Sequence, residues 1–162
     1  MTTNTPPYNF DNQLALGESG AAFLDTYFAR WFSIERASRD DQRQGIDRYF
    51  TTRNQKQRLG VEYKTDAAAS RTGNAFIETI SVDTTGKPGW VHSSKADYLF
   101  YYLPRDGVIY MLKMATIRQQ LAYWEAHFPT RHVPNNGYHT VGILVPLREF
   151  ERCAEAVFVA TA

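Results

Sequence analysis

The sequence predicts a mixed α/β domain with an antiparallel run of strands near its start. Apolar residues recur at spacings of three and four over residues 17–37, which is the period of an amphipathic helix. Residues 74–83 alternate between two faces as a strand does, and residues 45–52 and 58–65 are two further strand candidates around a turn at residues 54–55. A helix followed by three strands indicates an α/β architecture.

The chain is expected to be one domain preceded by an arm. Residues 1–15 are polar and contain Pro6-Pro7, so they are predicted to form a flexible arm. Residues 16–162 then have the ordinary size of a single domain. The stretch 38–44 offers no apolar anchor for a core and is predicted to be a loop.

A hairpin is predicted near the middle of the chain. The Asp-Gly pair at residues 106–107 is a strong turn signal between two extended runs, residues 98–103 and 108–114. Before this hairpin, Ser93 or Ser94 is expected to cap a short helical turn.

The remainder of the chain is expected to form accessory helices and one strand. Ile117, Leu121 and Trp124 would give the first of these helices its apolar face. The predicted elements are a helix from Thr116 to about His127, a loop over residues 129–137, a last short strand over residues 140–145, and a terminal helix opened by Pro146.

Composition excludes several classes of protein. The 162 residues are 43% hydrophobic and 14% aromatic, which is enough for a packed core and unlike a disordered chain. No apolar run approaches the roughly 20 residues that a membrane span needs, and the first ten residues lack the features of a secretory signal. The single cysteine, Cys153, excludes a disulfide framework and favours a reducing, cytoplasmic compartment.

Positive charge is concentrated in the first half of the chain. Residues 30–71 hold ten Lys and Arg against six Asp and Glu, a net charge of +4, although the whole chain has a net charge of only +1. A surface that faces a polyanion and an ordinary solvated face both account for this bias.

Asp47 and the run Glu62-Tyr63-Lys64 form the constellation best suited to chemistry. Alternation along a strand puts Glu62 and Lys64 on one face and Tyr63 on the other. If the hairpin is symmetric about residues 54–55, Asp47 lies directly opposite Glu62, and cross-strand partners sit about 5 Å apart.

Two carboxylates so placed repel each other unless a cation lies between them. Asp47, Glu62 and the Tyr63 carbonyl would hold a divalent cation with oxygen ligands, which selects Mg²⁺ or Mn²⁺. Together with Lys64, such an ion suits the hydrolysis of a phosphodiester. Glu18 is a further candidate ligand. The alternative on the pattern alone is an ordinary cross-strand set in which Lys64 stabilises the sheet between two acids.

The same residues resemble the PD-(D/E)xK nuclease superfamily over about residues 17–103, with Gly17-Glu18 on the preceding helix. The resemblance implies a restriction-endonuclease-like fold, with an αβββαβ core, a mixed sheet and C-terminal accessory helices. It also implies that Asp47 and Glu62 are metal ligands, Lys64 the catalytic lysine and Glu18 the helix acid. The segments at residues 76–81, 86–90 and 94–98 are similar to phage and prophage members of the superfamily.

The resemblance implies a Mg²⁺-dependent DNA endonuclease that hydrolyses phosphodiester bonds in phage recombination, repair or restriction. Arg48 and Arg71 flank the proposed centre, and Lys87 and Lys95 lie near a glycine-containing loop, so these four are the expected DNA contacts. A homodimer is expected because cutting two strands needs two sites. The alternatives are a catalytically silent DNA-binding module of the same fold and an interaction protein without a nucleic-acid role.

Overall fold

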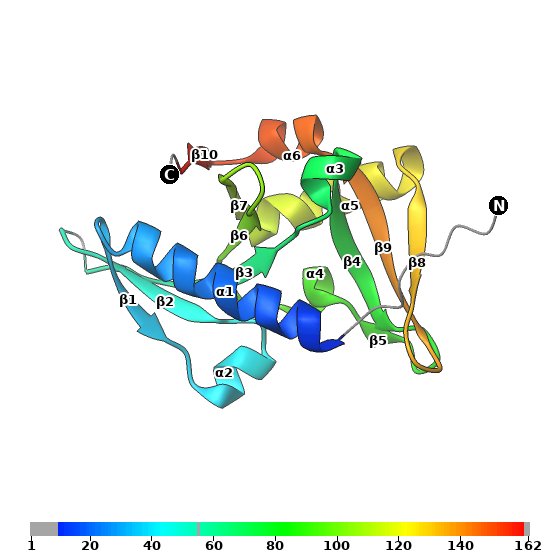
Figure 1. The fold of residues 1–162 in the computed structure, drawn as a ribbon, viewed down its shortest axis with the longest axis horizontal. Coiled ribbons are helices and arrows are strands. Elements are labelled where there is room, and N and C mark those ends of the chain that lie inside the picture. Colours follow the sequence, from blue (N-terminus) through cyan, green and yellow to red (C-terminus); the bar gives the residue numbers. More distant parts are fainter. Residues whose placement is uncertain (1–9, 55, 161–162) are drawn as a thin grey trace.

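The computed structural model describes residues 10–54 and 56–160, which form two β-sheets with helices around them (Figure 1). The described helices are α1 (Phe10–Phe28), α2 (Arg39–Arg43), α3 (Ala69–Thr72), α4 (Trp90–Ser93), α5 (Met114–His127) and α6 (Leu147–Cys153). The described strands are β1 (Phe32–Arg36), β2 (Arg48–Thr52), β3 (Arg58–Thr65), β4 (Asn74–Val82), β5 (Lys87–Pro88), β6 (Tyr98–Leu103), β7 (Val108–Lys113), β8 (Thr130–Pro134), β9 (His139–Pro146) and β10 (Ala156–Val159).

The larger sheet has the strand order β1-β2-β3-β6-β7-β10, and the smaller sheet has the order β5-β4-β9-β8. All neighbouring strands are antiparallel except β3 and β6, which pair in parallel. Parallel strands need a long connection. Here that connection, residues 66–97, carries α3, β4, β5 and α4, and so contributes two strands to the second sheet.

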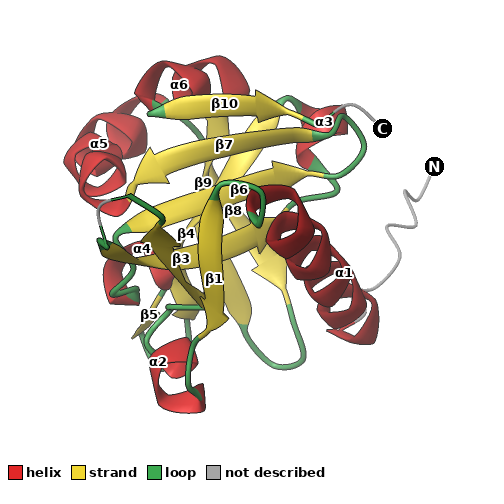
Figure 2. Cartoon of the chain, turned by 90° about the vertical axis from the view of Figure 1, so that its left-hand side faces the viewer, coloured by secondary structure: helices red, strands yellow, loops and turns green. Residues whose placement is uncertain are grey.

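Two apolar cores stabilise this arrangement. The first lies beneath α1, where Leu24 and Phe28 pack against Phe50, Val61 and other residues of the larger sheet. The second joins the two sheets with α5 and α6 and contains, among others, Ile77, Leu99, Leu112, Trp124, Ile143 and Phe150. Figure 1 shows α1 lying across β1, β2 and β3, and Figure 2 shows α1 apart from α5 and α6.

The predicted mixed α/β class is confirmed, and several elements lie where the sequence placed them. Strand β3 has the predicted bounds, β6 and β7 form the predicted hairpin, and Pro146 precedes a helix. Gly107 ends the hairpin turn with a φ of 65°, which explains the strength of the Asp-Gly signal.

The N-terminal predictions need correction. Helix α1 begins at Phe10, within the predicted arm, and ends at Phe28, whereas the sequence predicted a helix over residues 17–37. Residues 32–36 form β1 because they pair with β2 in a regular antiparallel ladder. The rest of the predicted arm, residues 1–9, lies outside the described residues.

The short elements also differ from the predictions. Residues 39–43 form α2, not a loop, because the Ser38 side chain caps its first turn at the Asp41 N–H. Ser94 follows α4 instead of capping its start, and α5 begins at Met114, before Thr116.

Several predictions about the strands were wrong. Residues 74–82 form a strand as predicted, but it belongs to the second sheet because it pairs with β9, so the antiparallel run is β1-β2-β3. The predicted loop at residues 129–137 contains β8, which pairs with β9. The strand predicted to be the last, over residues 140–145, is β9, and a further strand, β10, follows it.

Candidate functional site

The hairpin of β2 and β3 brings Asp47 beside Glu62 in the predicted register. Arg48 pairs with Val61 and Tyr49 pairs with Gly60, so the next position places Asp47 opposite Glu62. The Asp47 N–H donates to the Val61 carbonyl at 2.9 Å, and Asp47 Oδ2 accepts from the Tyr63 N–H at 2.8 Å. The Asp47 carboxylate is therefore fixed at the edge of β3 by the backbone itself.

Glu62 is a buried acid with an unsatisfied oxygen. Its exposed fraction is 3%, and Lys64 Nζ lies 2.8 Å from its Oε1 atom. The other oxygen, Oε2, is buried and has no hydrogen-bond partner among the described residues. Such a group costs free energy unless another partner reaches it, because burial removes the water that would otherwise solvate it.

Lys64 lies among several carboxylates. Burial alone would lower the pKa of its ammonium, but attraction and hydrogen bonding to Glu62, together with attraction to Asp47 and Glu78, raise that pKa above its ordinary value. In this arrangement Lys64 stays protonated at neutral pH. It suits stabilisation of negative charge better than removal of a proton.

Glu78 is a fourth member of this cluster, and the sequence prediction missed it. It belongs to β4 in the second sheet, and its Oε1 accepts from the Trp90 N–H at 3.3 Å. Burial raises the pKa of Glu78, and attraction to Lys64 partly offsets this shift. The available signal was a carboxylate in a predicted strand whose neighbours at 76, 77 and 80 are apolar, but the residues that Glu78 meets in the site come from a different sheet.

The approach of α4 to β4 fixes the surroundings of Glu78. A side chain at Gly89 would place its Cβ atom 2.3 Å from the Glu78 carbonyl oxygen, so only glycine fits there. The Gly89 N–H donates to the Thr79 carbonyl at 2.9 Å. Trp90, the next residue, has its ring 5.8 Å from Lys64 Nζ. The wall of the site beside Lys64 is therefore built by the second sheet and α4.

Glu18 is not brought into this cluster. It is exposed on α1, and α1 packs against the face of β3 that carries Val61 and Tyr63. Glu62 and Lys64 project from the opposite face, because side chains alternate along a strand. The predicted role of Glu18 as a metal ligand has no geometric support here.

The donor set partly fits a divalent cation. Within residues 10–54 and 56–160, no three His, Cys, Asp or Glu side chains come together in an arrangement that could hold a metal ion as they stand. Asp47 and the unpartnered Oε2 atom of Glu62 nevertheless supply two adjacent carboxylates with oxygen donors. The residues therefore fit a cation held by two protein carboxylates and completed by other ligands.

Arg48 lies on the face of the sheet away from Glu62. Its guanidinium binds the Asp25 carboxylate of α1 through two nitrogens, with the Nε atom 2.9 Å from Oδ1 and the Nη2 atom 2.9 Å from Oδ2. Its side chain is 13% exposed. The Tyr63 hydroxyl donates to the same Asp25 carboxylate at 3.0 Å. Arg48 therefore holds α1 against the sheet. The guanidinium that was predicted to contact DNA is paired with Asp25.

The other three predicted DNA contacts are exposed. Arg71 lies on α3, Lys87 on β5 and Lys95 just after α4. Lys87 is close enough to Glu78 to lower the pKa of that carboxyl slightly, against the larger effect of burial. Lys87 therefore lies on the Glu78 side of the cluster.

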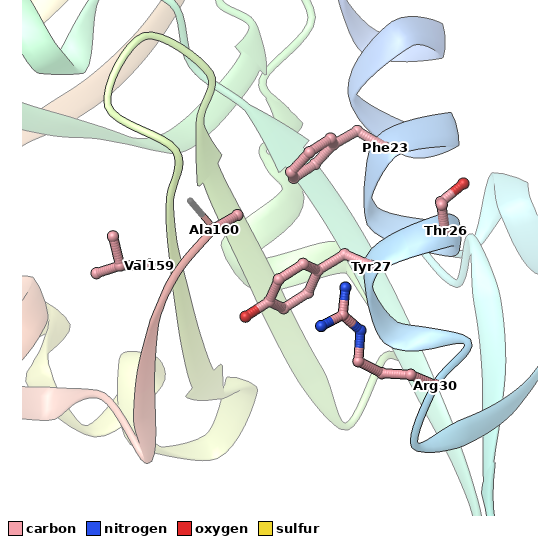
Figure 3. Close-up of a pocket in the computed structure, with 6 residues that line it drawn as sticks. All are labelled: Phe23, Thr26, Tyr27, Arg30, Val159 and Ala160. Carbon is pink, nitrogen blue, oxygen red and sulfur yellow. The ribbon is translucent and has the colours of Figure 1, made fainter. Parts of the chain in front are cut away.

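A separate pocket of about 220 Å³ lies between the end of α1 and the end of β10 (Figure 3). It is lined by Phe23, Thr26, Tyr27, Arg30, Val159 and Ala160. The Arg30 guanidinium lies 5.0 Å from the Tyr27 ring centroid. None of the predicted site residues lines this pocket.

Among the described residues, no helix combines the length and the apolar character that a membrane crossing requires. Comparison of the chain with models of protein families, with curated proteins and with solved structures gave no match in any of the three.

Proposed function

We propose that this protein is a metal-dependent phosphodiesterase that cuts DNA, with its site at Asp47, Glu62 and Lys64. The observation that carries the proposal is the buried Glu62 carboxylate, which lies opposite Asp47. Its Oε2 atom has no hydrogen-bond partner among the described residues. A chain that kept these residues only to stabilise a sheet would have no reason to bury an unsatisfied carboxylate oxygen.

The order of the elements supports a restriction-endonuclease-like core. Helix α1 precedes the antiparallel strands β1, β2 and β3, and β3 then pairs in parallel with β6. This is the order αβββαβ if the short helices α3 and α4 take the place of the second helix. Strands β4 and β5 would then be an insertion between β3 and β6, and β8 and β9 would complete the second sheet from later in the chain.

Each residue has a role that follows from its position. Asp47 and Glu62 would hold Mg²⁺ or Mn²⁺ between β2 and β3. The bound ion would supply charge neutralisation at the phosphate and activation of a water molecule. Lys64, protonated and on the same face as Glu62, would donate hydrogen bonds to a phosphate oxygen and stabilise the negative charge that builds up during attack.

The face of β3 that carries Glu62 and Lys64 also carries basic and aromatic groups suited to nucleic acid. Arg58 lies four residues before Glu62 on the same strand and therefore on the same face. Its guanidinium is 3.5 Å from the centroid of the Tyr49 ring. Arginine beside an aromatic ring can contact both phosphates and bases. The preference for DNA over RNA comes from the resemblance, as do the proposed homodimer and a role in phage recombination, repair or restriction.

Cleavage assays test the proposal. Plasmid, linear, single-stranded and four-way-junction DNA are incubated with Mg²⁺, Mn²⁺ or EDTA and with wild type, Lys64→Ala or Lys113→Ala. Lys113 is the matched control, since it lies at the end of β7 and pairs with a carboxylate of Glu155 at 3.7 Å. Cleavage by wild type and Lys113→Ala, lost with EDTA and in Lys64→Ala, is the expected result. Equal cleavage by all three proteins would reject Lys64 as the catalytic lysine.

A catalytically silent DNA-binding module is the second candidate. The observation that favours it is the ion pair of Lys64 with Glu62, which offsets part of the negative charge that would attract a metal ion. This candidate predicts salt-sensitive DNA binding without cleavage under any metal condition.

A further inference from the structure

We infer that Glu78 is a positioning residue of the candidate site, which receives the Lys64 ammonium when Glu62 binds a cation. The inference rests on the proposed function, because it concerns the same site. It adds a residue from the second sheet that neither the motif nor the resemblance includes.

The Lys64 ammonium lies among three carboxylates. One ammonium, that of Lys64, interacts with the carboxylates of Glu62, Asp47 and Glu78. Among the described residues, only the Glu62 carboxylate forms an ion pair with it, at 2.8 Å. A group of three carboxylates and one ammonium attracts a divalent cation. A cation at the Glu62 Oε2 atom, which has no hydrogen-bond partner among the described residues, would offset the charge of Glu62 and repel the Lys64 ammonium.

A bound cation would therefore weaken the ion pair between Lys64 and Glu62. An ammonium that loses its ion-pair partner in a partly buried site pays a desolvation cost, and the Lys64 side chain is only 36% exposed. Asp47 cannot replace Glu62, because its Oδ2 atom accepts from the Tyr63 N–H and the carboxylate also faces the cation. Of the three carboxylates that interact with Lys64, this leaves Glu78.

The Glu78 carboxylate is only partly hydrogen-bonded. Its Oε1 atom accepts one hydrogen bond, a long one of 3.3 Å from the Trp90 N–H, and the structure gives its other oxygen no hydrogen bond within the described part of the chain. Gly89, which tolerates no side chain against Glu78, holds α4 close to β4. Glu78 is therefore held in place with one oxygen available to an ammonium.

A double-mutant cycle on Mn²⁺ affinity tests the inference. The full-length chain is titrated with Mn²⁺ in the absence of DNA, and free Mn²⁺ is followed by electron paramagnetic resonance. The four proteins are wild type, Glu78→Gln, Lys64→Met and the double variant. Glu125→Gln is the matched control, because it removes the same charge from the exposed face of α5.

Glu78→Gln is expected to weaken Mn²⁺ binding about tenfold when Lys64 is present, as removal of an outer partner of a metal site does. In the Lys64→Met background it is expected to change the affinity by less than about twofold, because the group it positions is gone. Glu125→Gln should bind Mn²⁺ as wild type does. If Glu78→Gln does not fold, Glu78→Asp, which retracts the carboxylate by one methylene, takes its place in the cycle with the same expectation.

Two outcomes overturn the inference. Equal weakening in both backgrounds would make Glu78 a direct ligand or a purely long-range charge, and no weakening in either would place it outside the site. In both cases wild type would still bind Mn²⁺ and cut DNA, so the proposed function would stand. Wild type that neither binds Mn²⁺ nor cuts DNA would reject the proposed function together with the inference.

Discussion

Arg48 and Asp47 are neighbours in the chain, yet they serve opposite faces of one sheet. Asp47 lies beside Glu62, whereas Arg48 binds Asp25 of α1 and lies 5.5 Å from the Tyr63 ring. Burial alone would lower the pKa of Arg48, but the hydrogen bonds to Asp25 raise it. The alternation of a strand thus separates a candidate catalytic carboxylate from a structural ion pair within two residues.

Replacing Arg48 by alanine is expected to lower the free energy of unfolding by about 3 kcal/mol, because the partly buried Asp25 loses its bidentate partner. Arg43→Ala is the matched control, since Arg43 pairs with Asp40 on the surface with both side chains more than three-quarters exposed. That variant should lose at most about 1 kcal/mol. Urea unfolding followed by circular dichroism measures both, and similar losses would show that Arg48 does not anchor α1.

The candidate site could be predicted from the sequence only where its parts are local. Asp47, Glu62 and Lys64 belong to one hairpin, so a short turn and regular pairing were enough to place them together. Glu78 reaches the site through the packing of a second sheet, and no spacing along the chain encodes that distance. Glu18 was proposed from its position on the first helix and from the resemblance, and neither specified the direction of its side chain.

At the scale of elements, the end of α1 shows a limit of periodicity. Trp31 and Ile34 continue the three-and-four spacing of the helix, but the chain turns after Phe28, where the Trp31 N–H donates to the Phe28 carbonyl. No Gly or Pro marks this stop in the sequence. Phe32 and Ile34 still face the core beneath α1, because positions two apart on a strand share a face. A helical and an extended continuation bury similar residues, so pairing with β2 decides between them.

The close contact of α1 with β3 gives a prediction with an internal control. A Cβ atom at Gly20 would lie 1.9 Å from Thr65 Oγ1 and 2.9 Å from Thr65 Cβ, whereas one at Gly17 would meet nothing within 4 Å. Gly20→Ala should therefore destabilise the fold by about 2 kcal/mol through overpacking.

Gly17→Ala, on the same helix, should stabilise it by about 0.5–1 kcal/mol, because alanine favours the helix. Thermal unfolding of the two variants should move the midpoint in opposite directions. Stabilisation by both substitutions would show that α1 does not rest closely on β3.

At the scale of the whole molecule, buried tyrosines make stability depend on alkaline pH. Burial, together with the neighbouring Asp25, raises the pKa of Tyr63, and burial with the neighbouring Asp66 raises that of Tyr101. The unfolded chain releases these protons near pH ~10, while the folded protein keeps them. Stability is therefore full below that pH and falls as the pH rises through it, by about 1.4 kcal/mol per pH unit for each tyrosine.

Urea unfolding between neutral and strongly alkaline pH measures this loss. Tyr63→Phe and Tyr101→Phe should each reduce the slope at high pH, although each also removes a hydrogen bond to a carboxylate and lowers stability at neutral pH. Tyr123→Phe is the control, because Tyr123 is 47% exposed. An unchanged slope in the first two variants would contradict the assignment.

The connection between β3 and β6 ties the candidate site to the order in which the chain is made. Asp47, Glu62 and Lys64 are in place once β2 and β3 pair, but β4, which carries Glu78, pairs with β9, which is made later. Glu78 pairs with Gly142 across that ladder. A chain still emerging from the ribosome would thus have Asp47, Glu62 and Lys64 in place before Glu78 is positioned beside them. Completion of the candidate site would therefore wait for synthesis of β9.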